Sequence, residues 1–158
     1  TNTDGKPEHR VSLTFHQRTK GRLRINTEEG VDAGISIERG QILENGQLLQ
    51  SQEGSILEVL AKPEDVSVAT TDSAALFARA CYHVGNRHAE VQIGDNKLIY
   101  LRDHVMDEML RLIGLSVSEQ QLPFQPENGA YATGHGHSHK HSHHNDEHGH
   151  HEHHEHEH

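Results

Sequence analysis

The residues best able to do chemistry in this chain are histidines near its C-terminal end. Between His135 and His158, 13 residues are histidine, interleaved with Gly, Ser, Asn, Lys and acidic residues. Neutral imidazole is the commonest metal-ligating side chain and suits nickel, zinc and copper. The segment therefore offers many interchangeable sets of metal ligands. The candidate ligands in it are His135, His137, His139, His141, His143, His144, His148, His150, His151, His153, His154, His156 and His158.

Residues 133–158 have no apolar side chains with which to build a core, so we expect this tail to be disordered without metal. A purification tag would give a similar composition. Tags are normally homogeneous blocks, however, and this segment is interrupted by Lys140 and five acidic residues. The pattern therefore indicates a natural metal-binding tail.

Composition excludes several classes of protein. The net charge is −10 with histidine neutral, of which the body before the tail carries −6. An acidic body argues against binding to nucleic acid, whose phosphates require a basic surface. Cys81 is the only cysteine, so no disulfide can form within the chain. No apolar run approaches the length of a membrane span and no signal peptide is visible, which predicts no membrane association and a cytoplasmic location.

Residues 1–62 show the pattern of a small all-β domain. Residues 1–10, which include His9, are polar and are expected to be an irregular lead-in. Apolar residues then alternate with polar ones from Val11 and predict short strands, with His16 at the end of the first. Asn45-Gly46 predicts a tight hairpin turn between strands 41–43 and 47–49. Residues 55–61 predict a further strand.

Residues 63–132 have a different pattern, in which helices and strands alternate. The predicted order is strand 66–70, a helix capped by Thr71 or Asp72 and ended by Gly85, strands 90–93 and 97–101, a helix from Asp103 to Gly114, and strand 115–122. The second helix has an apolar stripe of Val105, Met106, Met109, Leu110 and Ile113. This β-α-β-β-α-β order is typical of ferredoxin-like folds. The whole chain is thus predicted to be α+β.

Five histidines lie outside the tail. His9 and His16 are explained as surface residues. His83 falls in the last turn of the first predicted helix, where interaction with the helix dipole explains it as well as a ligand role does. His104 follows Asp103, a carboxylate that could orient the imidazole or simply cap the helix. His88 falls in the loop after Gly85-Asn86-Arg87, where no helical period accounts for it.

Several phrases in this sequence resemble one family. These are ACYHVGNRH at 80–88, DHVMDEMLRLIGL at 103–115 and LPFQPENGAYA at 122–132, followed by a histidine-rich tail. An early LTFHQRTKGRLRI segment at 13–25 and the Glu-Arg-Gly at 38–40 add to the likeness. In this order the phrases resemble the UreE family of urease accessory proteins over nearly the whole chain.

The resemblance implies a cytosolic, homodimeric nickel metallochaperone that passes Ni²⁺ to the urease assembly machinery. Its expected partners are the urease apoprotein and the accessory proteins, including the GTPase; Zn²⁺ or Cu²⁺ could replace nickel in vitro. The family has an N-terminal β domain with a peptide-binding-like shape and a ferredoxin-like metal-binding domain. His88 matches the histidine that pairs across the dimer to bind metal, and His104 matches an auxiliary metal site. Some relatives carry another histidine two residues before the latter, where this chain has Arg102.

Two other functions are compatible with the sequence. A metal store or buffer would use the tail alone, and a peptide-binding module would carry the tail incidentally. An enzyme is not expected, because the sequence contains no P-loop, no G-x-S-x-G and no H-E-x-x-H motif. Cys81 lies on the apolar face of its predicted helix, so we interpret it as a core residue rather than a nucleophile.

Overall fold

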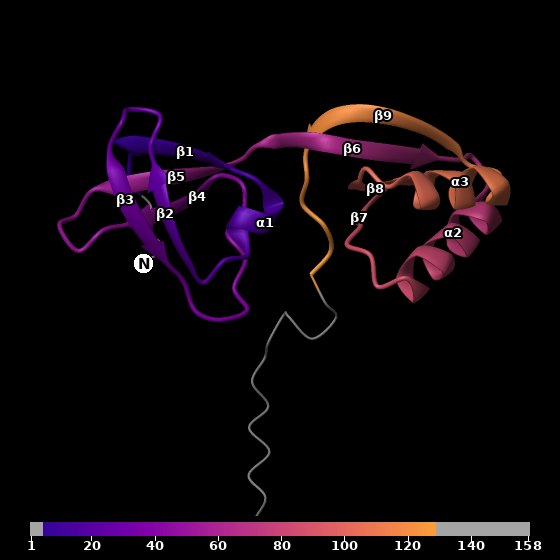
Figure 1. Ribbon diagram of the computed structural model, residues 1–158, viewed down its shortest axis with the longest axis horizontal. Coiled ribbons are helices and arrows are strands. Elements are labelled where there is room, and N and C mark those ends of the chain that lie inside the picture. Colours follow the sequence, from indigo (N-terminus) through magenta and orange to yellow (C-terminus); the bar gives the residue numbers. More distant parts are fainter. Residues whose placement is uncertain (1–4, 129–158) are drawn as a thin grey trace, which may run out of the picture. The chain divides into compact units, whose positions relative to one another are not determined.

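A computed structural model describes residues 5–128 of the chain, and the described residues up to Glu127 belong to one compact unit (Figure 1). The histidine-rich tail predicted at 133–158 lies outside the described residues. No helix within the described part is long and apolar enough to cross a membrane. Strands precede a mixed β-α-β-β-α-β region, so the predicted α+β class is confirmed.

The N-terminal region consists of two small sheets around one core. Its elements are β1 (His9–Leu13), α1 (Phe15–Arg18), β2 (Arg22–Asn26), β3 (Asp32–Ser36), β4 (Gln47–Gln50) and β5 (Ile56–Ala61). Strands β1, β5 and β4 form one sheet, in which β1 is parallel to β5, and β2 and β3 form a separate antiparallel hairpin. Alternating apolar side chains fill the core, as the period-two pattern predicted. They are Val11, Leu13, Ile25, Ile35, Leu43 and Val59.

The start of this region differs from the prediction in two ways. His9 begins β1 rather than lying in an irregular lead-in. Thr14 follows β1 and caps α1. Its side chain accepts a hydrogen bond from the backbone N–H of Gln17, and the Gln17 side chain accepts one from the N–H of Thr14. This capping box starts a helix at Phe15. His16 therefore lies on α1, exposed, and not in the first strand.

The predicted hairpin at Asn45-Gly46 is wrong. The observed hairpin joins β4 to β5, and residues 41–44 are not a strand. The Asn45 side-chain oxygen accepts a hydrogen bond from the N–H of Ala61 at 2.8 Å, and the N–H of Leu43 donates to the Arg18 carbonyl at 3.0 Å. The second bond uses a backbone N–H that the predicted local strand pair would need, and the first ties the turn to the end of β5.

The C-terminal region has the predicted element order. It contains β6 (Pro63–Thr70), α2 (Ala74–Asn86), β7 (Gln92–Gly94), β8 (Lys97–Leu101), α3 (His104–Ile113) and β9 (Ser116–Pro123). The sheet order is β7-β8-β6-β9 with every neighbouring pair antiparallel, which is the ferredoxin-like arrangement. Both helices pack against the same face of this sheet (Figure 1). The shared core is Ala69, Ala80, Val84, Leu98, Tyr100, Met106, Leu110 and Leu115.

Three local predictions in this region need correction. Ser73, not Thr71 or Asp72, caps α2, and Gly85 lies inside α2 instead of ending it. In α3 the predicted apolar stripe includes Val105, which is 60% exposed, while Asp107 is buried. The buried carboxylate is accommodated because the Tyr100 hydroxyl donates a 2.7 Å hydrogen bond to it. Burial and this contact raise the pKa of Tyr100, so its hydroxyl stays a donor.

A third core cluster joins α1, the C-terminal sheet and the segment after β9. It contains Phe15, Val66, Val68, Ile99 and Phe124, with the rings of Phe15 and Phe124 edge to face at 5.5 Å. Arg18 is only 1% exposed and donates hydrogen bonds to the carbonyl of Leu43 at 2.9 Å and to that of Phe124. Burial lowers the pKa of the Arg18 guanidinium. We call residues 124–127, which this arginine holds at one end, the strap.

Candidate metal centre

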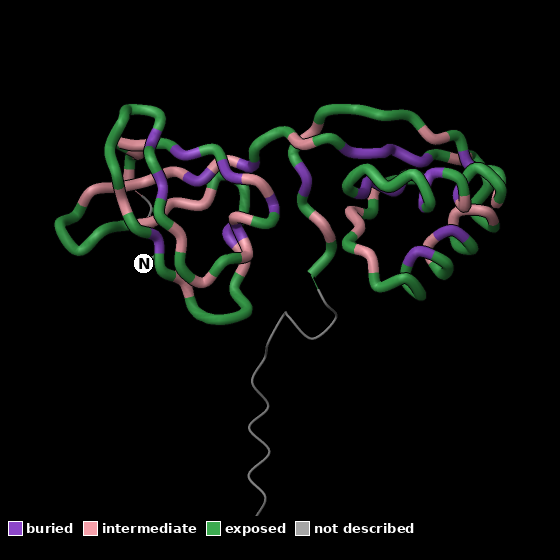
Figure 2. Tube along the Cα trace, in the orientation of Figure 1, coloured by how far each residue is buried: buried purple, intermediate pink, exposed green. Residues whose placement is uncertain are grey.

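His88 lies immediately beyond the end of α2. The helix forms because an Ala-rich sequence places Ala80 and Val84 inward at helical spacing, with Leu76, Phe77 and Cys81 half-buried beside them. It ends at Asn86, and the next residue, Arg87, caps it with an N–H that donates to the carbonyls of Val84 and Gly85. Residues 85–88 are all exposed (Figure 2). The predicted loop position of His88 is therefore confirmed.

The backbone of His88 has an unusual conformation. Its φ is +53°, in the left-handed region, and its N–H donates to the Gly85 carbonyl at 3.0 Å. Glycine adopts the left-handed conformation after a helix with less strain than any other residue. Residues Ala89 and Val91 then pack against the core, so the loop is fixed on both sides. His88 adopts an unfavourable backbone conformation while its side chain remains exposed. A residue of this kind is a candidate for function.

His83 is also exposed, on the last turn of α2 as predicted. The rings of His83 and Tyr82 pack edge to face, with their centres 5.4 Å apart. The position in the last turn of the helix suits the helix-dipole interpretation, and the exposed ring leaves a ligand role open. Both interpretations given for His83 remain compatible with this geometry.

His104 is the first residue of α3 and is exposed. Asp103 caps the helix, since one of its oxygens accepts from the N–H groups of Val105 and Met106 at 2.8 and 3.0 Å. Arg102 forms an ion pair with Glu119 at 2.5 Å. Two of the polar side chains nearest to His104 in sequence are thus already engaged, which favours the capping interpretation of Asp103.

The described histidines do not assemble a metal site within one chain. In residues 5–128, no group of three or more His, Cys, Asp or Glu side chains is placed to hold a metal ion. The thirteen candidate ligands of the tail lie outside these residues. Cys81 packs against the core, as predicted, and burial raises the pKa of its thiol, which disfavours the metal-binding thiolate. A site built on His88 therefore needs ligands from the tail or from a second copy of the chain.

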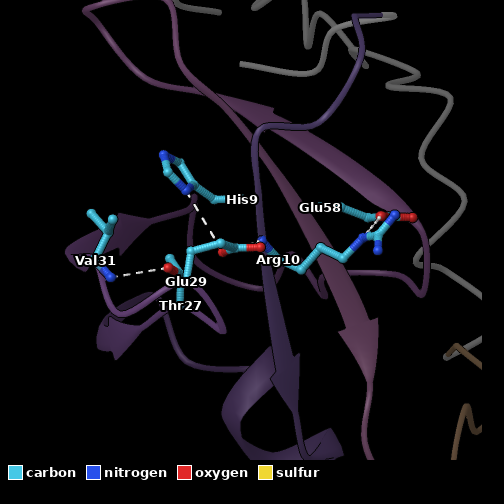
Figure 3. Close-up of polar contacts among 6 residues, drawn as sticks. All are labelled: His9, Arg10, Thr27, Glu29, Val31 and Glu58. Carbon is cyan, nitrogen blue, oxygen red and sulfur yellow. Dashed lines mark hydrogen bonds and ion pairs between the residues drawn. The ribbon is translucent and has the colours of Figure 1, made fainter.

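His9, by contrast, has a local carboxylate partner (Figure 3). Its Nδ1 lies 3.6 Å from an oxygen of Glu29, and the same oxygen accepts from the N–H of Arg10 at 3.1 Å. Arg10 itself extends to Glu58 at 2.9 Å. The turn that carries Glu29 is closed by a bond from the N–H of Val31 to the Thr27 hydroxyl. This histidine is part of the packing between β1 and that turn.

No pattern in the sequence predicts the contacts made by the strap. The N–H of Gln125 donates to the Gln92 side chain at 3.0 Å, and the N–H of Glu127 donates to the Val91 carbonyl at 2.8 Å. The Gln125 side chain accepts from the N–H of Asn45 at 3.0 Å. The strap therefore ends against β7 and the residue before it. No periodicity marks such a segment, because its partners are scattered through the chain.

These features define a class: a two-part α+β protein with a ferredoxin-like C-terminal half and exposed histidines at the ends of its helices. Comparison with known proteins gives the family. The family model for the N-terminal domain of the UreE urease accessory protein matches residues 1–62. The family model for the UreE C-terminal domain matches residues 64–158.

Individual relatives agree with the family models. The urease accessory protein UreE of Shewanella halifaxensis is 49% identical over 122 residues, covering 77% of this chain and 71% of the relative. That of Dechloromonas aromatica is 47% identical over 130 residues, covering 79% and 74%. That of Alkalilimnicola ehrlichii is 49% identical over 121 residues, covering 77% and 74%. The chain belongs to the UreE family of urease accessory proteins. Because this family consists of accessory proteins, the expectation that the chain is not an enzyme is confirmed.

Proposed function

We propose that this protein is a nickel-binding metallochaperone that delivers Ni²⁺ to the urease assembly machinery. Membership of a family of urease accessory proteins supports a role in urease maturation. The expected partners are the urease apoprotein and the other accessory proteins, including the GTPase, in the cytoplasm. Imidazole ligands suit nickel, although copper binds such sites more tightly. Preference for nickel must therefore come from geometry, supply or partner.

The observation that carries the proposal is the placement of His88. Its ring is exposed, it sits in a loop fixed by Ala89 and Val91, and its left-handed backbone would suit glycine better. Packing does not require the ring there, because the buried contacts of the loop come from Ala89 and Val91. An exposed, positioned imidazole is what a chaperone needs in order to bind a metal ion and release it to a partner.

We further propose that a homodimer completes the site. A single imidazole is a poor metal site, and a two-fold axis beside His88 would place two of them together in a self-complementary interface. Tail imidazoles would supply further ligands, and His104 an auxiliary site. Such exchangeable ligands favour transfer, whereas a closed cage of thiolates would hold a metal permanently.

The alternative is a metal store, and the tail is the observation that favours it. With 13 of the 18 histidines, the tail could account for most of the metal capacity by itself. The two functions differ in what the body of the protein does. A store needs no specific site on the body, while a chaperone must bind metal there.

Deleting residues 133–158 separates these functions. Nickel titration of the full-length and truncated proteins, read by native mass spectrometry, would give metal number and oligomeric state together. A chaperone should remain a dimer and retain about one nickel ion per dimer, since the His88 pair is intact. It should also still support urease activation when nickel is in excess. A truncated protein that binds no nickel would contradict the proposal and support the store.

A further inference from the structure

Strand β9 forms an open edge of the C-terminal sheet. It is the last strand in the order β7-β8-β6-β9, and among the described residues no further strand lies beyond it (Figure 1). It pairs with β6 in one unbroken register from Ser116 to Pro123. Six of its eight residues are exposed, and Figure 2 shows this exposure along the strand. The strand therefore offers a long and accessible backbone edge.

This edge carries unpaired backbone groups at alternate residues. In β6, the Asp65 carbonyl accepts from the N–H of Arg102 at 3.1 Å, so the odd-numbered residues of β6 bond to β8 and the even-numbered ones to β9. The even-numbered residues of β9 therefore bond to β6. The N–H and C=O groups of Val117, Glu119 and Gln121 face outward, and none of them has a hydrogen-bond partner among the described residues. An added extended strand presents donors and acceptors at the same spacing.

Natural proteins usually protect such edges, and β9 lacks the usual protection. Typical devices are lysine side chains, an interior proline, a bulge, a short strand or a covering segment. The opposite edge has two of them, because β7 is only three residues long and the strap bonds to Gln92 and to the residue before it. Residues 116–122 contain no lysine or proline, and their register has no bulge. An edge left open in this way is a candidate interaction surface.

The side chains beside the open edge favour a cationic occupant. Arg102 forms an ion pair with Glu119, and the Gln121 side chain donates to Asp65 at 2.6 Å. Two carboxylates against one guanidinium leave a local charge of −1, on a body of charge −6. Side chains of an added strand that pair with Glu119 and Gln121 would lie on this same face. The face has a hollow of about 270 Å³, lined by Asp65, Val66, Arg102, Glu119, Gln120 and Gln121.

We propose that the β9 edge binds an extended segment of another protein by strand addition, and that this segment carries lysine or arginine at alternate positions. Its backbone pairs with the outward groups of Val117, Glu119 and Gln121, and its basic side chains lie beside the hollow. A second copy of β9 fits less well, because it would bring two hollows of the same negative charge together. The inference is independent of metal binding, since the loop of His88 precedes β7 at the opposite edge of the sheet.

Binding can be measured with a defined probe on the full-length protein in the absence of metal. The probe is a seven-residue peptide, blocked at both ends, in which threonine alternates with lysine. It should shift the amide NMR signals of Val117, Glu119 and Gln121 and slow the exchange of these amide protons with solvent, because they become donors in a new ladder. The same peptide methylated on the backbone nitrogen of each lysine keeps its charge but loses its donors. It should bind about 10-fold more weakly.

Exchanging the charge tests the side-chain part of the inference. Glu119→Lys reverses the charge beside the edge and leaves the backbone groups in place. This variant should bind the lysine peptide about fivefold more weakly than the parent, and it should prefer a peptide with glutamate in place of lysine. The matched control is Glu53→Lys, in the turn between β4 and β5, which changes the net charge equally. It should bind both peptides like the parent.

The inference would be overturned by equal binding of the methylated and unmethylated peptides, by equal effects of the two substitutions, or by amide shifts outside β9. Shifts of the same three amides that depend on protein concentration, without peptide, would also overturn it by assigning the edge to a second copy of the chain. None of these measurements involves nickel, so a negative result here leaves the proposed delivery of nickel unaffected.

Discussion

His9 and His88 show how differently two regions of one protein use the same side chain. His9 lies at the start of β1 with its Nδ1 3.6 Å from Glu29, and its side chain is 27% exposed. His88 lies beyond the end of α2, exposed, in a left-handed backbone conformation. The first histidine is placed by packing and a carboxylate partner. The second is placed by its backbone, and its ring remains accessible.

This difference shows that a histidine is a candidate ligand only when its ring is free to contact a metal ion. A metal competes with whatever already holds the imidazole. In the N-terminal region, charged side chains around His9 are paired across β1, the 27–31 turn and β5. In the C-terminal region, the loop of His88 is anchored through its apolar residues instead. The ring of His88 makes no hydrogen bond or ion pair with the described residues.

The largest expected effect follows from replacing each histidine in turn. In the protein lacking residues 133–158, His88→Ala should weaken the tightest nickel site by more than about 100-fold, because both imidazoles of the proposed pair disappear. His9→Ala is the matched control and should leave nickel affinity unchanged. Calorimetric titration with Ni²⁺ measures both, and circular dichroism checks that each variant folds. Equal affinity in the two variants would remove the functional basis of the comparison.

A smaller effect should separate the backbone of His88 from its side chain. At φ +53° glycine is unstrained, whereas alanine is disfavoured by about 1 kcal/mol. His88→Gly should therefore be more stable than His88→Ala by about 1 kcal/mol in urea unfolding of the tail-deleted protein. Both variants should lose the nickel site. If the glycine variant is no more stable than the alanine variant, the left-handed conformation does not restrict which residue can occupy position 88.

The sequence was most informative where structure is determined locally. Asp103 caps α3 and Gly114 ends it at φ +113°, both as predicted, because caps depend on a few neighbouring residues. The position of His88 after α2 could be predicted for the same reason. The end of α2 itself could not, because a glycine permits the left-handed conformation without requiring it. Gly85 stays helical, and His88 adopts that conformation instead.

Predictions failed where distant residues compete for the same groups. The turn at Asn45 is determined by Ala61, and residues 41–44 by the buried Arg18. Burial of Asp107 depends on the hydroxyl of Tyr100. No local pattern contains such pairs. The ligand set around His88 is non-local in the same sense, since it requires residues from outside the loop, and for that reason it stays a prediction.

The smallest expected effect concerns Glu29, the partner of His9. The pKa of its carboxyl is lowered, chiefly because the backbone N–H of Arg10 donates to it, with smaller contributions from Thr27 and His9. A carboxylate with a lowered pKa in the folded state stabilises the protein above its unfolded-state pKa, and this stabilisation is lost as pH falls through the folded-state pKa. Glu29→Gln should therefore lower Tm at neutral pH by about 1–2 °C, since Glu29 is exposed and screened by solvent. The difference from the parent should shrink to zero at a pH below the folded-state pKa, where the parent's carboxyl is also neutral. Thermal unfolding at both pH values measures this difference in Tm, with Glu28→Gln as the neighbouring control. A difference that persists in acid would show that the charge on Glu29 does not hold the turn against β1.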